Sequence, residues 1–110
     1  MTFTEELKAT AQSLVSIGKG ILAADESLNT ENQRFQKLGI PETIQMRCAC
    51  REMLFTAPGI GAYISGVLLF DETIRQTNRE GTSFITVLQK SGIIPGIKLD
   101  KGTVVVRALG

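Results

Sequence analysis

Three short apolar runs in this sequence end in residues that can do chemistry. Residues 21–24 stop at Asp25-Glu26-Ser27, and residues 66–70 run into Asp71-Glu72-Thr73, while residues 96–102 mix apolar side chains with alternating charge. Short apolar runs bounded by polar residues are typical of buried strands. In parallel α/β proteins, ligands bind at the carboxyl ends of the strands. The pattern therefore predicts one wall of an active site.

Asp25 and Lys98 are the strongest candidates for catalysis. A carboxylate at the end of a buried strand is partly shielded from water, which suits proton transfer; it equally suits capping of the next turn, and spacing alone favours neither. Strand alternation turns Lys98 away from Ile97 and Leu99. If these two pack outward against helices, Lys98 points inward, where its ammonium needs a carboxylate or a phosphate. On neighbouring strands, Asp25 and Lys98 would form an acid–base pair.

A weaker group consists of Ser27, Thr30 and Arg34. Hydroxyls near the start of a helix, with an arginine one turn further on, suit a phosphate group. Helix capping beside a solvated arginine explains the same residues, and the residues alone favour that explanation.

Composition excludes several other classes of function. The chain has 110 residues, a formal net charge of +1, no histidine and two cysteines. A zinc site and a nucleophile–histidine triad are therefore not expected, and neither is a nucleic-acid surface. No apolar run is long enough to span a bilayer, and the polar, acidic residues 2–8 do not resemble a secretory signal. We expect a cytoplasmic protein with its cysteines reduced.

The elements that position these residues follow from periodicity and caps. The pattern predicts an amphipathic helix capped by Thr2 or Thr4, a short helix capped by Asn29 or Thr30, and a helix with Pro41 in its first turn. Strands are expected over residues 63–70 and 93–99. The buried stripe of the third helix is expected to comprise Met46, Ala49, Cys50, Met53 and Leu54.

Between these strands, residues 73–81 suggest a loop or a frayed helix start, although Asp71 and Glu72 suit the first turn of a helix. Ser83 is expected to cap a further helix that ends at Gly92. Alternation of strands and helices predicts a parallel sheet of the α/β class. Three strand–helix units are fewer than half of a (β/α)₈ barrel, which needs ~250 residues.

The chain resembles class I fructose-bisphosphate aldolase. The likeness extends from the first helix to about Thr103, and it is carried by the segments GKGILAADES (18–27), GVLLFDET (66–73) and GIKLDKG (96–102), which follow the family's order. The resemblance implies a partial (β/α)₈ (TIM) barrel of about three parallel strand–helix units. It further implies a glycolytic lyase that cleaves fructose 1,6-bisphosphate into two triose phosphates through a lysine Schiff base, without a metal or other cofactor.

The resemblance also implies roles for single residues. Asp25 matches the aspartate that handles protons around the C4 hydroxyl, and Lys98 matches a lysine that contacts phosphate and supports catalysis. Ser27 and Thr30 match hydroxyl positions on the phosphate side, and Arg34 matches an arginine near the phosphorylated sugar substrate. Arg47 keeps a basic position on the next helix.

The sequence departs from the family pattern at Gln33, where a lysine is usual, and over residues 104–110. In the family, the Schiff-base lysine lies on later strands. We therefore expect residues 1–110 to be the N-terminal fragment of an aldolase-type barrel domain, inactive alone. The expected partners are a complementing C-terminal segment or a second copy of the chain. A non-catalytic sugar-phosphate-binding or interaction module and a fragment without function are the alternatives.

Overall fold

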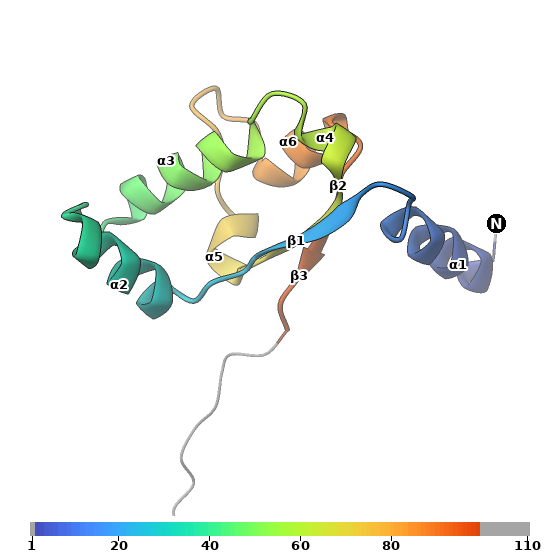
Figure 1. The fold of residues 1–110 in the computed structure, drawn as a ribbon, viewed down its shortest axis with the longest axis horizontal. Coiled ribbons are helices and arrows are strands. Elements are labelled where there is room, and N and C mark those ends of the chain that lie inside the picture. The colour runs from blue at the N-terminus through green and yellow to red at the C-terminus, as the bar shows by residue number, and fades with distance from the viewer. Residues whose placement is uncertain (1, 100–110) are drawn as a thin grey trace, which may run out of the picture.

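The computed structural model describes residues 2–99, and Figure 1 shows its arrangement. Three parallel strands form one sheet in the order β1-β2-β3, which confirms the predicted α/β class. The last residues of the third motif, Asp100 to Gly102, and residues 104–110 lie outside the described part. The elements are α1 (Phe3–Leu14), β1 (Gly20–Ala24), α2 (Leu28–Leu38), α3 (Ile44–Phe55), α4 (Ile60–Tyr63), β2 (Ile64–Leu69), α5 (Asp71–Ile74), α6 (Phe84–Lys90) and β3 (Ile94–Ile97).

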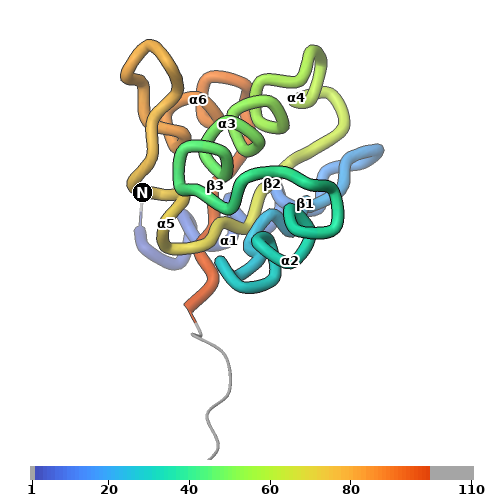
Figure 2. The backbone as a smooth tube through the Cα atoms, turned by 90° about the vertical axis from the view of Figure 1, so that its left-hand side faces the viewer, coloured from blue at the N-terminus to red at the C-terminus, as the bar shows by residue number. Residues whose placement is uncertain are grey.

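Helices cover one face of the sheet. Figures 1 and 2 show α3, α4 and α6 on the same side of the strands. On β2, Val67 and Leu69 are buried on this side, whereas Leu68 between them is 40% exposed. We call the first side the covered face and the other the open face. Because side chains alternate along a strand, each strand contributes to both faces.

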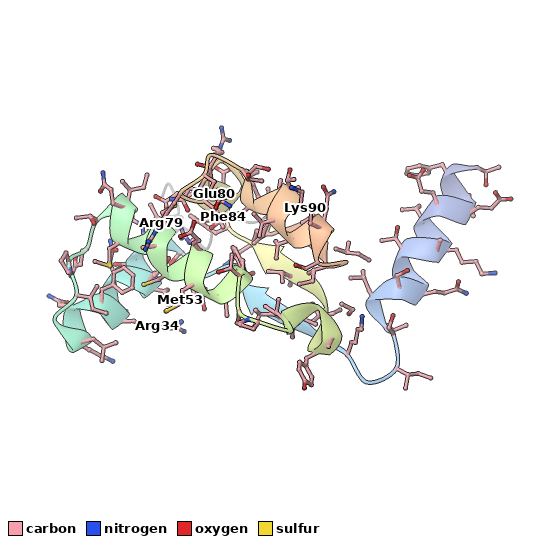
Figure 3. All side chains as sticks on the ribbon, turned by 90° about the horizontal axis from the view of Figure 1, so that it is seen from above. Arg34, Met53, Arg79, Glu80, Phe84 and Lys90 are labelled. Atoms are coloured by element: carbon pink, nitrogen blue, oxygen red, sulfur yellow. The ribbon has the colours of Figure 1, made fainter. Side chains whose placement is uncertain are left out.

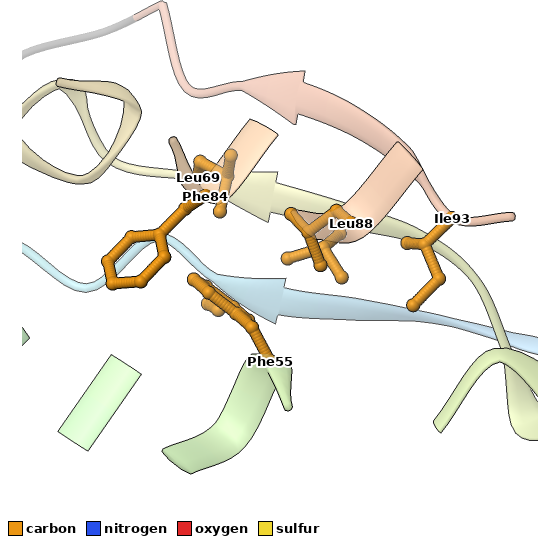
Figure 4. Packing of buried hydrophobic residues seen from close by; sticks show 7 residues of the cluster. Phe55, Leu69, Phe84, Leu88 and Ile93 are labelled. Atoms are coloured by element: carbon orange, nitrogen blue, oxygen red, sulfur yellow. The ribbon is translucent and has the colours of Figure 1, made fainter. Parts of the chain in front are cut away.

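The core lies between the covered face and the helices. Phe55 from α3 and Phe84 from α6 are fully buried, and their rings meet edge to face with centroids 5.4 Å apart. Figure 4 shows them with Leu69, Leu88 and Ile93. This packing of α3 and α6 fixes the helix layer on the sheet.

Local signals set most of the helix ends. Thr2 caps α1 in a capping box with Glu5, and Ser83 caps α6, as predicted. The N-cap of α2 is Ser27 rather than Asn29 or Thr30, because the Ser27 hydroxyl accepts the Thr30 N–H. The helix expected to begin near Pro41 begins at Ile44 instead. Thr43 caps it by accepting the Met46 N–H.

The expected strand ends shift inward. Tyr63 belongs to α4, and β2 begins at Ile64; β3 is shorter than the predicted 93–99. Asp71 and Glu72 do begin a short helix, α5, after which residues 75–83 form a connection to α6. The strands thus end just where the polar motifs begin.

The predicted buried stripe of α3 is wrong. Met53 is 71% exposed and Ala49 is also exposed, while the buried residues of α3 are Arg47, Arg51 and Phe55. These three are spaced four residues apart, so they share one helix face. The face that α3 turns inward therefore carries two guanidinium groups beside a single aromatic ring.

The first helix stands apart from the other elements. None of its residues is buried, and Figures 1 and 3 show it projecting from the end of the sheet. Only its end is tied down: Ser65 Oγ donates to Leu14 O at 2.6 Å, and a Cβ on Gly66 would lie 2.5 Å from Leu14 Cδ2. A side chain at position 66 would therefore have to displace the tip of Leu14. Among the described residues, no helix is long and apolar enough to cross a membrane.

Candidate active site

The carboxyl ends of the three strands meet at one edge of the sheet, because the strands are parallel. The register pairs Ala24 with Leu69, and Leu69 with Ile97, so these three share the covered face. One further step of alternation gives Asp25 and Lys98 the open face. The fold thus brings both predicted catalytic residues to the same edge and the same side of the sheet.

Asp25 and Lys98 are not on neighbouring strands, contrary to the prediction. The strand β2 lies between β1 and β3, so their backbones are two strand spacings apart, roughly 10 Å. Among the described residues, the two form no salt bridge with each other, and both side chains are half-buried. This separation leaves room for a small molecule between a carboxylate and an ammonium.

The strand ladder holds the backbone of Lys98. Its N–H donates to Leu69 O at 2.9 Å, which continues the pairing beyond the last residue of β3. Ile97 lies on the covered face, as expected, but the predicted packing of both neighbours against helices is incomplete, since Ile97 is 43% and Leu99 is 88% exposed. The orientation of Lys98 therefore rests on the β2 backbone rather than on helix packing.

The hydroxyls predicted for phosphate are engaged in capping. Ser27 Oγ lies 3.0 Å from Thr30 Oγ1 and accepts the Thr30 N–H at 3.2 Å. Arg34 pairs with Glu26 at 2.9 Å, with 62% of its side chain exposed. Ser27 lies just before α2, and Thr30 and Arg34 lie within it. They remain accessible, so an anionic ligand at this helix start would meet two hydroxyls and a guanidinium.

A buried ionic cluster lies between α2, α3 and α5, and sequence reasoning missed it. Arg47 makes a bidentate pair with Glu72 at 2.9 and 3.0 Å and donates to Asn32 Oδ1 at 3.0 Å. Because fork-shaped pairs of this kind fix geometry as well as charge, Arg47 ties the start of α5 to α3.

Arg51 occupies the centre of this cluster. Its Nη1 donates to Glu72 at 2.6 Å and to Gln76 at 2.9 Å, and its Nη2 donates to Glu31 at 2.7 Å. Only 6% of its side chain is exposed. One guanidinium thus contacts the helix that follows β1 and the helix that follows β2.

The two carboxylates of the cluster respond differently to their surroundings. The hydrogen bond from Arg47 is the main reason that the pKa of Glu72 lies below its usual value. Burial is the main reason that the pKa of Glu31 is raised, although Arg51 opposes the shift. The same bond to Glu72 raises the pKa of Arg47. Two guanidiniums and two carboxylates leave the cluster with no formal net charge.

A sequence signal for this cluster does exist. Arg47 and Arg51 are spaced four apart in line with Phe55, and Glu31 and Glu72 each follow soon after a strand end. Apolar periodicity passes over charged residues, so it predicts the stripe of Met46, Ala49, Cys50, Met53 and Leu54 instead.

The two cysteines lie outside the strand-end edge. Cys48 Sγ donates to Thr77 O at 3.3 Å, and burial raises the pKa of this thiol. Cys48 lines a surface pocket of about 490 Å³ between α3 and residues 75–79, and none of the predicted site residues lines that pocket. Among residues 2–99, no cluster of three or more potential metal ligands occurs.

Comparison with known proteins places this geometry in a family. The model for class-I fructose-bisphosphate aldolase matches residues 6–109. A Plasmodium falciparum (isolate K1) fructose-bisphosphate aldolase is 50% identical over 91% of this chain and 28% of its own length. A Xanthomonas campestris protein described as a probable fructose-bisphosphate aldolase class 1 is 52% identical over 89% of this chain and 29% of its own.

A solved structure agrees with these relatives. It is a fructose-bisphosphate aldolase from Plasmodium falciparum in complex with TRAP and a small-molecule inhibitor; the TM-score is 0.89 at 47% identity. The match covers 96% of this chain and 30% of that one. The chain therefore spans less than a third of the length of the proteins that it matches.

Proposed function

Because the chain belongs to the class I fructose-bisphosphate aldolase family, we propose that it supplies the first three strand–helix units of an aldolase barrel. Residues 1–110 would be the N-terminal portion of that barrel domain. In the assembled barrel the open face becomes the interior, and the two edge strands, β1 and β3, gain neighbours. The complete domain cleaves fructose 1,6-bisphosphate into two triose phosphates, and it acts in the cytoplasm.

The observation that carries this proposal is the placement of Asp25 and Lys98 on one face and one edge, on either side of β2. In retro-aldol cleavage, a lysine amine condenses with the C2 carbonyl and releases water, which gives an iminium. A base then removes the C4 hydroxyl proton, the C3–C4 bond breaks, and its electron pair moves into the iminium to give an enamine. Asp25 handles that proton, and Lys98 balances charge beside the substrate.

The iminium-forming lysine comes from outside this segment, since the family resemblance places it on later strands. The helix start at Ser27 and Thr30, with Arg34, contributes to binding of one phosphate. For this role the Arg34 guanidinium leaves Glu26 and binds the phosphate. The free-energy cost of breaking that ion pair is small, because exposed pairs contribute little stability.

A chimera tests the proposal directly. Residues 1–110 of this chain replace the matching segment of the Plasmodium falciparum aldolase, whose structure superposes with a TM-score of 0.89. The expected result is cleavage of fructose 1,6-bisphosphate, measured as release of triose phosphate. The unaltered Plasmodium enzyme is the positive control. A folded chimera that binds the sugar phosphate without cleaving it would instead support a non-catalytic binding module.

A second measurement uses the 110-residue chain alone. Borohydride reduction in the presence of dihydroxyacetone phosphate should leave no covalent adduct on this chain, whereas the chimera should form one. Mass spectrometry reads both samples. A stoichiometric adduct on Lys98 in the chain alone would overturn the assignment of the iminium to a later strand.

A further inference from the structure

The helix α2 carries or adjoins most of the predicted substrate contacts, yet it has little apolar anchorage. Ser27 caps it, and Arg34 lies on it. Phe35 is its only buried residue, while Leu38 is 73% exposed. A helix held by one aromatic side chain is free to rock against its neighbours, so other contacts must set its position.

The ionic cluster supplies those contacts. Glu31 of α2 pairs with Arg51 at 2.7 Å, with only 13% and 6% of the two side chains exposed. One residue further on, Asn32 accepts a hydrogen bond from Arg47. Both contacts lie in the first half of α2, within two turns of the Ser27 cap. We call these two contacts, Arg51–Glu31 and Arg47–Asn32, the clamp. The clamp acts on the N-terminal half of α2, which is the end nearest the candidate site.

Arg51 connects that helix to the neighbouring strand. Its contact with Glu72, at 2.6 Å, reaches the residue two positions after Phe70, which follows β2 directly. Asp25 stands at the end of β1, and β2 is the strand between it and Lys98. A guanidinium joining both post-strand segments thus sets the spacing of the loops from which the site is built.

We propose that Arg51 is a positioning residue, which holds the start of α2 at a fixed distance from the end of β2 and thereby places Ser27 and Arg34 toward the substrate phosphate. This inference rests on the proposed aldolase function for its chemistry, but the clamp itself is a property of the described residues. Arg51 touches no substrate and acts through Glu31.

The geometry requires an arginine. Arg51 donates to three acceptors, Glu31, Glu72 and Gln76, which belong to two helices and the residues after α5. A planar guanidinium spans acceptors in fixed directions, whereas a lysine ammonium is a compact point charge on a flexible stem. Glu72 keeps its bidentate bond to Arg47 when Arg51 is replaced, so the α3–α5 contact survives. The pairing with Glu31 is lost, which leaves the Arg47–Asn32 hydrogen bond as the remaining polar contact described between α3 and α2.

Kinetics of the chimera test the positioning role. Arg51→Lys keeps the charge and should lower kcat/KM for fructose 1,6-bisphosphate by up to about 10²-fold, since small misplacements of binding groups have effects of that size. Arg51→Ala should recover part of that loss when free guanidinium is added at millimolar concentration, but not with urea at the same concentration. Arg75→Lys, an exposed arginine paired with Asp71, is the matched control and should change little.

A role confined to stability predicts another pattern: a lower melting temperature, unchanged kcat/KM below it, and no rescue by guanidinium. That pattern in the chimera would overturn the proposal. If the chimera bearing the unaltered sequence is inactive, the proposed function fails instead. The positioning role of Arg51 is then tested by a measurement that does not depend on activity.

Hydrogen exchange on the 110-residue chain is that measurement. Arg51→Met should accelerate exchange in peptides from α2, residues 28–38, while peptides from β2 and α6 keep the protection of the parent chain. Arg75→Met provides the control in the same experiment. Equal exchange in α2 with and without Arg51, or a uniform increase along the chain, would overturn the positioning role.

Discussion

The two faces of the sheet differ in what covers them and in what they carry. On the covered face, Val67 and Leu69 are at most 1% exposed, and they pack under Phe55 and Phe84. On the open face, Ile21 is 49% and Leu68 is 40% exposed. The same strands thus present a finished core on one side and an uncovered surface on the other.

Because of this difference, substitutions on the two faces should affect different properties, namely stability and catalysis. The buried side chains of the covered face have packing partners within residues 2–99, so substitutions there should change the stability of the fold. The open face ends at Asp25 and Lys98, and in the proposed barrel it faces the substrate, so substitutions there should act on catalysis.

The largest effect is expected on the open face, in the active chimera. Asp25→Asn keeps the shape of the side chain but removes the base, so turnover should fall by about 10²–10⁴-fold with little change in substrate binding. Lys98→Met removes a charge that the bound substrate also uses, so KM should rise as well as kcat fall. Steady-state kinetics separate the two outcomes. Unchanged turnover in Asp25→Asn would rule out Asp25 as the proton carrier.

The second effect belongs to the covered face. Phe55→Ala deletes a ring that is fully buried against Phe84, and it should destabilise the 110-residue chain by about 3–5 kcal/mol. Leu68→Ala on the open face should have a much smaller effect, because its side chain is already half in solvent. Urea unfolding followed by circular dichroism measures both. Equal losses would mean that something covers the open face in solution, such as a second copy of the chain.

Sequence alone predicted the parts of the fold that depend on local rules. The parallel sheet followed from apolar runs separated by helical segments. The capping roles of Thr2 and Ser83 followed from hydroxyls placed just before apolar periodicity. Asp25 was expected at a strand end because an apolar run stops just before it. Lys98 was expected inside a strand of residues 93–99, whereas it lies one residue beyond the end of β3.

The rest depended on tertiary contacts that no local pattern encodes. Strand order decides whether Asp25 and Lys98 are neighbours, and only the sheet shows that β2 separates them. The buried face of α3 is set by Glu31 and Glu72 on other elements, whose carboxylates make it favourable to bury Arg47 and Arg51. Hydrophobic periodicity assigns such a face wrongly because it scores each charged residue as exposed, without regard to a partner that lies elsewhere in the sequence.

A smaller effect is expected on acid stability, through the ionic cluster between α2, α3 and α5. The pKa of Glu72 is lowered in the fold, so its stabilising contribution is present above the unfolded-state value, about 4.5. That contribution is lost as the pH falls through the folded-state pKa. The raised pKa of Glu31 acts in the opposite sense and offsets part of the loss.

Glu72→Gln should therefore lower stability at neutral pH and flatten its decline below about pH 4.5. Glu80→Gln, at an exposed position, is the control and should leave the curve unchanged. Urea midpoints measured from pH 3 to pH 7 give the comparison. A Glu72→Gln curve parallel to that of the parent chain would show that Arg47 does not hold this carboxylate ionised.

The smallest effect should come from a buried polar group on α5. Thr73 is fully buried, and within the described residues its Oγ1 has no hydrogen-bond partner. Thr73→Val replaces that hydroxyl with a methyl group of similar shape and keeps the branched Cβ, so it should stabilise the chain by about 1 kcal/mol. Thr73→Ser, which keeps the hydroxyl and loses the methyl, should destabilise it. If both variants lose stability, the Thr73 hydroxyl has a hydrogen-bond partner in solution.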